Sequence, residues 1–255
     1  MFAKERQEKI EQYIVGHGSV SVQMLSERFN VSEVTIRKDL DELSKGNRIT
    51  RTHGGAVAKY QTRMNVGMDD LVIIHPEAKK RIAEKAMEYI EDGDSVMLDV
   101  STTVLEFAKL INQSDRKNIT VITPSLMVGR VFNNEAITVM VIGGILNQRL
   151  DATCGTVAEK LIKTISADKC FLGVNGIDSA FGLSTSDFTD ACLKSAMCDA
   201  SKQCFVLADH SKFHKRYLAQ ICKLEQKVDC IITDEKAEGV DYESIQHKVE
   251  IVFTK

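Results

Sequence analysis

The sequence predicts a two-domain protein: a small α+β domain at the N-terminus, followed by an α/β domain with a mostly parallel sheet. The length of 255 residues is enough for one large or two modest domains. An apolar share of 44% and only two prolines exclude long disordered segments. Helical periodicity fills about the first 45 residues, whereas β-rich runs alternate with helical patterns after Pro76. We therefore expect a folded, multi-domain protein.

The first helix is predicted from apolar residues that recur at helical spacing. Ile10, Tyr13 and Ile14 lie at positions i, i+3 and i+4, and we expect Gly16 and Gly18 to end the helix.

Two more helices follow with a short connection between them. Ser21 and Ser32 are suited to be their N-caps. In the third helix Ile36, Leu40 and Leu43 form the inward face, so Glu33, Thr35, Arg37 and Lys38 point outward near its start. This pattern is typical of a helix-turn-helix whose second helix reads DNA. A three-helix bundle without a ligand is the alternative.

The segment after these helices predicts a basic β-hairpin. Ile49, Arg51 and His53 alternate around a Gly54-Gly55 turn, and no acidic residue occurs between Glu42 and Asp69. Met1–Arg63 carries 11 Lys+Arg against 8 Asp+Glu, whereas the remainder carries 22 against 28. A basic wing beside a recognition helix neutralises phosphates, and we therefore expect double-stranded DNA as a partner.

These residues also carry a specific resemblance. The run SVSVQMLSERFNVSEVTIRKDLDELSKGNRITRTHGGAV resembles the winged helix of the DeoR family of bacterial transcriptional regulators, whose signature includes VS..TIR.DL..L and a terminal HGG. From the outward positions and the resemblance together, we expect these residues at the DNA: Ser32, Glu33, Thr35, Arg37, Lys38, Arg48, Arg51, His53, Gly54 and Gly55.

The rest of the chain predicts the second domain. We place the winged helix at residues 1–57, a linker without periodicity at 58–75, and the α/β domain at 76–255. A helix should run from Pro76 to about Glu91. The predicted strands are SVMLDV, ITVIT, ITVMVI, KCFLGV, CFVLAD, CIIT and EIVF. Because they are apolar on both faces and separated by helices, we expect a mostly parallel sheet covered on each side.

Polar residues follow the strand ends, where such sheets bind ligands. They are Ser101-Thr102-Thr103, Gly143-Gly144, Asn175-Gly176-Ile177-Asp178 and His210-Ser211-Lys212. Hydroxyls and amides at a helix N-terminus stabilise an anion, and a lysine adds a positive charge. The pattern favours a small ligand that carries a phosphate.

The resemblance extends through this half. DGDSVMLDVSTTVLEFAKL, VIGGIL, GLSTSDFTDACLKSAM and LADHSKF look like the family's C-terminal sensor domain, which resembles the ribose-5-phosphate isomerase and sugar-phosphate deaminase fold. It implies a phosphorylated sugar effector held by Asp99, Ser101, Thr102, Thr103, Gly143, Gly144, Asp178, Thr185, Asp187, Lys194 and Lys212. Ser101 stands where the family has glycine, and Pro124 where asparagine is common.

We therefore expect a DNA-binding repressor of sugar-uptake or catabolic genes that acts as a homo-oligomer, a dimer or tetramer. Repression is implied by the resemblance. The alternative is a sugar-phosphate isomerase or deaminase, with Asp99, Asp178 or Asp187 as acid or base and Lys212 on the phosphate.

Other classes of site are not expected. The seven cysteines form no CxxC pair and are interpreted as reduced, mostly buried thiols; Cys192 and Cys198 are not expected to form a redox pair. His210 and His214 are four residues apart, but no third metal ligand accompanies them, so we expect no metal site. We also expect no cofactor and no catalytic residue. With no apolar stretch of about 20 residues and no signal peptide, we expect a cytoplasmic protein without membrane contact.

Overall fold

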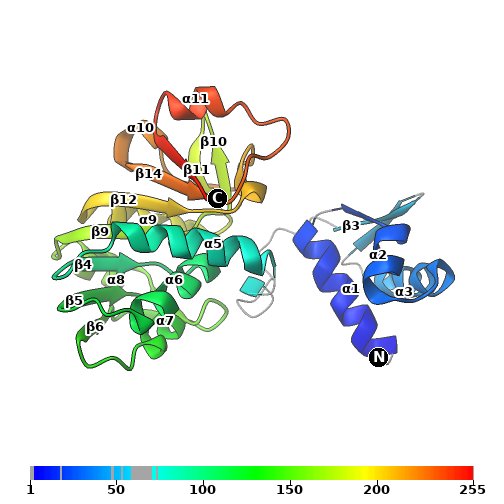
Figure 1. Cartoon of the computed structure of the whole chain (residues 1–255), viewed down its shortest axis with the longest axis horizontal. Helices are drawn as coiled ribbons and strands as arrows, with labels where there is room; N and C mark the ends of the chain where they lie inside the picture. Colours follow the sequence, from blue (N-terminus) through cyan, green and yellow to red (C-terminus); the bar gives the residue numbers. More distant parts are fainter. Residues whose placement is uncertain are drawn as a thin grey trace. The chain divides into compact units, whose positions relative to one another are not determined.

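The chain folds into two compact units, Met1–Ile74 and His75–Lys255, in a computed structural model (Figure 1). The structure describes residues 3–17, 19–46, 49–52, 54–58, 71–72 and 74–254. Most of the predicted linker lies outside these ranges. Its first residue, Ala58, belongs to a strand, so the wing runs one residue further than predicted.

The N-terminal unit contains the three predicted helices and a small sheet. The helices are α1 (Ala3–His17), α2 (Val22–Phe29) and α3 (Glu33–Lys45), and the strands are β1 (Ser19–Ser21), β2 (Ile49–Thr52) and β3 (Gly55–Ala58). Ser21 and Ser32 cap α2 and α3 as predicted, because their hydroxyls accept from the amides of Met24 and Thr35. The helix α1 ends at His17, between the two glycines that were predicted to end it.

The strands form an antiparallel sheet in the order β1-β3-β2. The β2–β3 hairpin is the predicted wing, whereas the pairing of β1 with β3 was not predicted. Below the sheet, the helices bury Ile10, Ile14, Leu25, Ile36 and Leu40 in one core. This packing fixes which face of α3 stays outside.

A buried ion pair also joins α1 to α3. Asp39 is buried, and its carboxylate accepts from Arg6 Nε at 2.6 Å and from Gln7 Nε2 at 2.9 Å. Burying a carboxylate is costly unless it is paired, so Arg6 holds this contact in place. The orientation of α3 is therefore set by polar as well as apolar contacts.

The C-terminal unit is built on a seven-stranded sheet in which every described pairing is parallel. The order is β15-β14-β12-β9-β4-β5-β6, which confirms the predicted mostly parallel sheet. Its strands are β4 (Ser95–Leu98), β5 (Ile119–Thr123), β6 (Ile137–Val141), β9 (Ala167–Leu172), β12 (Ser201–Leu207), β14 (Cys230–Thr233) and β15 (Glu250–Phe253).

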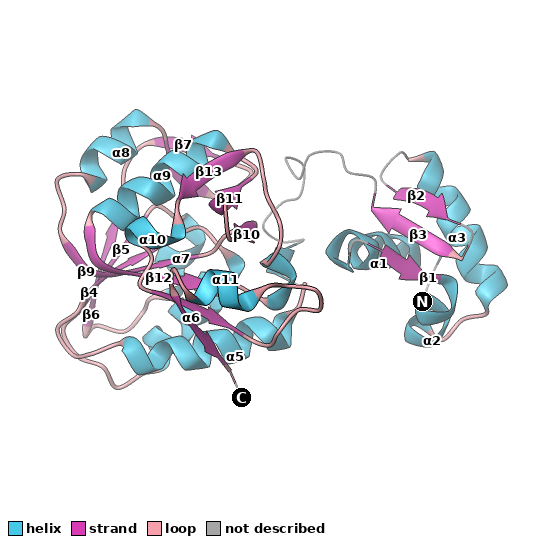
Figure 2. Cartoon of the chain, turned by 90° about the horizontal axis from the view of Figure 1, so that it is seen from above, coloured by secondary structure: helices cyan, strands magenta, loops and turns pink. Residues whose placement is uncertain are grey.

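Helices cover both faces of this sheet (Figure 2). α5 (Pro76–Ala86) and α6 (Thr102–Gln113) lie on one face, and α8 (Thr156–Ile162) and α9 (Phe188–Asp199) lie on the other. The α-helix from Pro76 ends at Ala86 and continues as a 3-10 turn over Met87–Tyr89, which is shorter than predicted. The remaining helices are α7 (Leu126–Val131), α10 (Leu224–Lys227) and α11 (Tyr242–Gln246).

Two small antiparallel sheets were not predicted. One pairs β7 (Ile145–Asn147) with β8 (Ala152–Cys154), and the other has the order β10-β11-β13. The latter contains β10 (Gly176–Asp178), β11 (Gly182–Thr185) and β13 (Ala219–Cys222). Strands of three or four residues are too short for alternation to identify them. These sheets carry several of the polar residues that follow the main strands.

Candidate functional site

The outer face of α3 is polar and exposed, as a DNA-reading helix requires. Glu33, Arg37 and Lys38 are exposed, and Thr35 is half-buried. The hydroxyls of Ser32 and Thr35 are 2.9 Å apart, so Ser32 is engaged in capping the helix. Arg37 donates to Glu33 at 2.9 Å, but such an exposed pair contributes little to stability. A phosphate or base edge can therefore displace Glu33 from Arg37.

The described wing residues Arg51, Gly54 and Gly55 each make a structural contact. A Cβ on Gly55 would overlap the carbonyl oxygen of Val20, so the pairing of β3 with β1 requires glycine there. Arg51 Nε lies 3.0 Å from Asp41 on α3, and Arg51 Nη1 donates to the Gly55 carbonyl at 3.3 Å. Arg51 thus ties the wing to α3 through its guanidinium. Gly54 accepts from the Val22 amide at 2.8 Å, and Arg48 and His53 lie outside the described residues.

In the C-terminal unit, a buried ion pair joins two of the predicted ligand residues. Asp99 follows β4 and Lys194 lies on α9, and their side chains meet at 2.5 Å. The same carboxylate accepts from the amides of Ser101 and Gly173, each at 2.8 Å. Three donors therefore satisfy Asp99, which fixes the loop after β4 against the end of β9 and against α9.

The pair extends into a network that sequence reasoning missed. Lys194 also lies 3.4 Å from Asp190, one turn earlier on α9, and Asp190 accepts from the Thr185 hydroxyl at 2.8 Å. Although burial disfavours its charge, the two carboxylates raise the pKa of Lys194 above its usual range. Burial raises the pKa of Asp190. The i, i+4 spacing of Asp190 and Lys194 was the signal that could have revealed the pair.

The loop after β4 approaches β9 so closely that Gly173 has no room for a side chain. A Cβ there would overlap Ser101 Cβ and Oγ. Ser101 itself has φ −89° and ψ 154°, a conformation open to any residue, and its hydroxyl caps α6 by accepting from Val104. The glycine that the family has at this position is therefore not needed for backbone freedom here. Thr102 and Thr103 are buried in the first turn of α6.

Further predicted residues lie on the neighbouring loops. Asp187 caps α9 through the amides of Thr189 and Asp190, and its other oxygen is 3.2 Å from Arg149. Gly143 and Gly144 connect β6 to β7; a Cβ on Gly144 would come within 2.8 Å of the Cys154 carbonyl oxygen. Close packing of the β7–β8 hairpin accounts for Gly144.

Lys212 lies in a charged group after β12. Its Nζ is 3.4 Å from Asp209 Oδ2, a buried atom that accepts no hydrogen bond from the residues that the structure describes. Lys79 on α5 is buried nearby; burial, together with the charge of Lys212, lowers the pKa of Lys79 to about 8. Glu106 on α6 acts on Lys79 in the opposite direction. The basic group thus borders the helix that Thr102 and Thr103 begin.

Asp178 has a structural role in this arrangement. Its carboxylate accepts from the amides of Ala180 and Phe181 and pairs with Arg216 at 2.9 Å, so it stabilises the β10–β11 turn. Among the described residues, Asp178 forms no hydrogen bond or ion pair with Asp99 or Lys194.

Of the two histidines considered as metal ligands, His210 lies in a group with two carboxylates, and His214 is not a member of that group. His210 Nδ1 lies 2.8 Å from Asp234, which raises the pKa of His210, and Glu235 lies 3.5 Å away. These three side chains are the one group of ligand type in the part of the chain that the structure describes. Arg81 also lies 3.8 Å from the Asp234 carboxylate.

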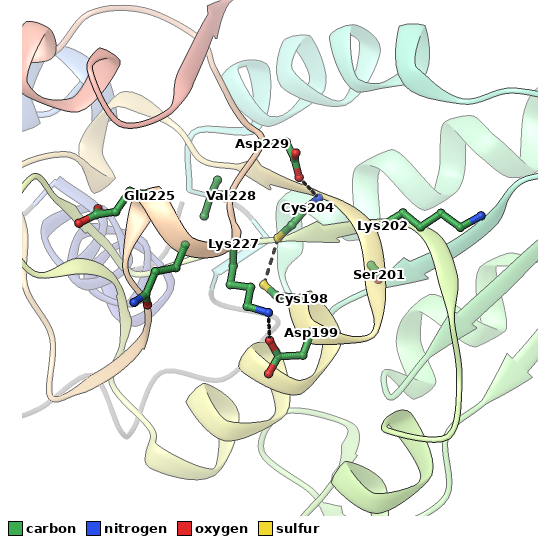
Figure 3. A pocket seen from close by; sticks show the side chains of 10 residues that line it. Cys198, Asp199, Ser201, Lys202, Cys204, Glu225, Lys227, Val228 and Asp229 are labelled. Carbon is green, nitrogen blue, oxygen red and sulfur yellow. Dashed lines mark hydrogen bonds and ion pairs between the residues drawn. The ribbon is translucent and has the colours of Figure 1, made fainter.

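Cys198 lies close to Cys204 rather than to Cys192, and both thiols are free. Cys198 Sγ lies 3.0 Å from Cys204 Sγ, beside a cavity of about 340 Å³ (Figure 3). Ser201 and Lys202 also line it and begin β12, so the cavity lies at the amino end of that strand. Ligands of parallel sheets bind at the opposite, carboxyl ends. This cavity is therefore separate from the predicted ligand edge.

Comparison with known proteins gives matches to both units. Residues 6–62 match the DeoR-like helix-turn-helix domain, and residues 74–235 match the DeoR C terminal sensor domain. A solved structure of D-ribose-5-phosphate isomerase covers 54% of each chain with a TM-score of 0.42 and 18% identity. No helix among the described residues is long and apolar enough to cross a membrane.

Curated relatives cover nearly the whole chain. The uncharacterized HTH-type transcriptional regulator YulB of Bacillus subtilis is 35% identical, over 97% of this chain and 95% of its own. The transcriptional repressor AccR of Agrobacterium fabrum is 34% identical, over 91% and 89%. The glycerol-3-phosphate regulon repressor of Escherichia coli is 32% identical, over 90% of each. All three are named regulators rather than enzymes, and the chain belongs to the DeoR family of transcriptional regulators.

Proposed function

We propose that this regulator is a repressor whose binding to operator DNA is changed by a phosphorylated sugar or a related metabolite. The observation that carries the proposal is the Asp99–Lys194 pair, which holds the Ser101–Thr103 loop at the N-terminus of α6. A helix N-terminus on a rigid support favours an anion. Lys212 follows β12, which is separated from β4 by β9 in the sheet, and supplies a positive charge. One relative is named for the glycerol-3-phosphate regulon, which supports a phosphorylated effector.

The DNA-binding part of the proposal rests on α3 and the wing. Arg37 and Lys38 are exposed on the outer face of α3, where a recognition helix contacts the major groove. A single small winged helix makes few base contacts, so we propose that the regulator binds as a homo-oligomer, with paired domains on two half-sites. Repression of sugar-uptake or catabolic genes is the expected outcome.

The test measures DNA binding by the full chain with and without phosphorylated ligands. An operator is first selected from a random duplex library, and its affinity is then measured by fluorescence anisotropy. Glycerol 3-phosphate and a panel of hexose phosphates are added, each beside its unphosphorylated counterpart. We expect at least one phosphorylated compound to change the affinity while its counterpart has no effect. If no phosphorylated compound acts, the proposed effector class is wrong.

Variants then test whether the loop and the lysine hold one phosphate. Thr102→Ala and Lys212→Ala should each reduce the effector's influence but leave effector-free DNA binding intact. If both contact the same phosphate, the double variant loses less than the sum of the singles, with a non-additivity of about 0.5 to 3 kcal/mol. Lys163→Ala, which removes an exposed lysine after α8, is the matched control. A normal response in both test variants would remove them from the site.

A further inference from the structure

One edge of the main sheet is both apolar and uncovered. β6 is the last strand of the order, and its outer side has no partner strand among the residues that the structure describes. Five large apolar residues are exposed on and beside it, with exposed fractions between 38% and 67%. They are Met140 and Val141 on β6, Ile145 and Leu146 on β7, and Val157 on α8. We call this set the β6 surface.

The members of the β6 surface come from elements that follow one another along the chain. Ile145 pairs with Cys154 across the β7–β8 hairpin, and its Cδ1 would lie 3.6 Å from a Cβ on Gly155. Gly155 immediately precedes α8, in which Val157 is exposed. On the other side, three residues, Ile142, Gly143 and Gly144, separate β6 from β7. Ile145 therefore lies beside the start of α8, whereas Met140 and Val141, as consecutive residues of β6, expose apolar side chains on opposite faces of the sheet at this edge.

This edge lacks the features that keep natural sheet edges apart. Edge strands are usually blocked by charged side chains, proline or a covering element. The opposite edge strand, β15, begins with Glu250 and follows Lys248. By contrast, no charged residue and no proline occurs between Glu135 and Arg149. An uncharged, apolar strand edge of this kind is a ready template for pairing with another strand.

We propose that the β6 surface is the contact between two copies of this chain, related by a twofold axis. This inference rests on the proposed oligomer and identifies its interface. A strand that pairs antiparallel with its own copy makes a closed contact, because the same residues serve on both sides. In a pairing centred on Val139, Ile137 faces Val141 of the other copy, and Glu135 faces Gly143. Like charges therefore do not meet across the axis.

The size of the surface agrees with a second copy as occupant. The exposed parts of the five side chains supply roughly half of the ~800 Å² that each partner buries in a standard interface. The outer backbone of β6 and the flanking polar residues can supply the rest. The absence of charge in the segment 136–148 gives a charged partner, such as nucleic acid, nothing to bind.

The experiment is sedimentation velocity on the full chain, with Ile145→Lys and Val157→Lys as test variants. Both positions are exposed, so folding should be unaffected, which circular dichroism checks. We expect the unaltered chain to self-associate, and each variant to raise the dissociation constant by at least about tenfold. Leu218→Lys is the matched control, because Leu218 is 76% exposed just before β13 and should leave assembly unchanged. A monomeric unaltered chain, no shift in the test variants, or an equal shift in the control would overturn the proposal.

A parallel measurement separates this inference from the proposed function. The same samples are tested for DNA binding and for a thermal response to glycerol 3-phosphate and the hexose phosphates. If assembly is insensitive to Ile145→Lys and Val157→Lys but phosphorylated compounds still act on DNA binding, the interface is wrong and the effector proposal stands. If the variants dissociate as expected but no compound acts, the effector proposal fails and the interface stands.

Discussion

Replacing Lys194 with methionine should destabilise the C-terminal unit strongly. The side chain is buried, and it neutralises Asp99 at 2.5 Å and Asp190 at 3.4 Å. Methionine has a similar volume but leaves both carboxylates without their cation. Removing one partner of a buried ion pair typically costs 3–5 kcal/mol, because an uncompensated charge stays in the interior. We expect a loss of about that size in the free energy of unfolding.

The loss should depend on pH with a predictable sign. Burial raises the pKa of Asp190 and Lys194 opposes that rise, so without Lys194 the pKa of Asp190 in the folded variant rises further above that in the unfolded chain. The folded state then binds more protons than the unfolded state as the pH falls, so stability increases toward acid. The deficit of the variant relative to the unaltered chain should therefore be smaller at pH 5 than at pH 8.

Urea unfolding followed by far-UV circular dichroism is the appropriate assay, since the chain contains no tryptophan. With a slope of roughly 2–3 kcal/mol per molar urea, the midpoint should fall by about 1–2 M. Lys202→Met is the control, because Lys202 pairs with Asp168 at an exposed position and should leave the midpoint unchanged. A loss below about 1 kcal/mol, or the same loss at both pH values, would refute the reasoning.

Three further outcomes are expected. Gly173→Ala should lower the melting temperature through overlap with Ser101, at a cost of about 1–3 kcal/mol, and Ser101→Gly should restore it. A phosphorylated ligand bound beside Lys79 should raise its pKa from about 8 toward the usual value, so calorimetry in two buffers should detect proton uptake above about pH 8. Arg37→Ala should weaken specific DNA binding by about 1 to 3 kcal/mol if it reads a base, or reduce the salt dependence by about one unit if it contacts a phosphate.

The main elements could be predicted because their signals are local. Apolar runs such as CIIT and ITVIT lie in the central sheet, and serine hydroxyls identified the starts of α2 and α3. The pairing of Asp99 with Lys194 could not be predicted from spacing, since 95 residues separate them. Nor could the structural role of Asp178, because it depends on a hairpin of three- and four-residue strands. Contacts between distant segments are what the local pattern leaves out.

The strand order has a consequence for how the two units reach their folded states. β4 lies inside the sheet between β5 and β9, and Val96 pairs with Lys169, far along the chain. Bringing such distant strands together costs loop-closure entropy before any contact is formed, so these parallel pairings form slowly. The wing pairs Thr52 with Gly55, and its longer-range pairing, Ser19 with Val57, still joins residues of the same short unit. We therefore expect the DNA-binding unit to fold during synthesis well before the sensor sheet closes around β4.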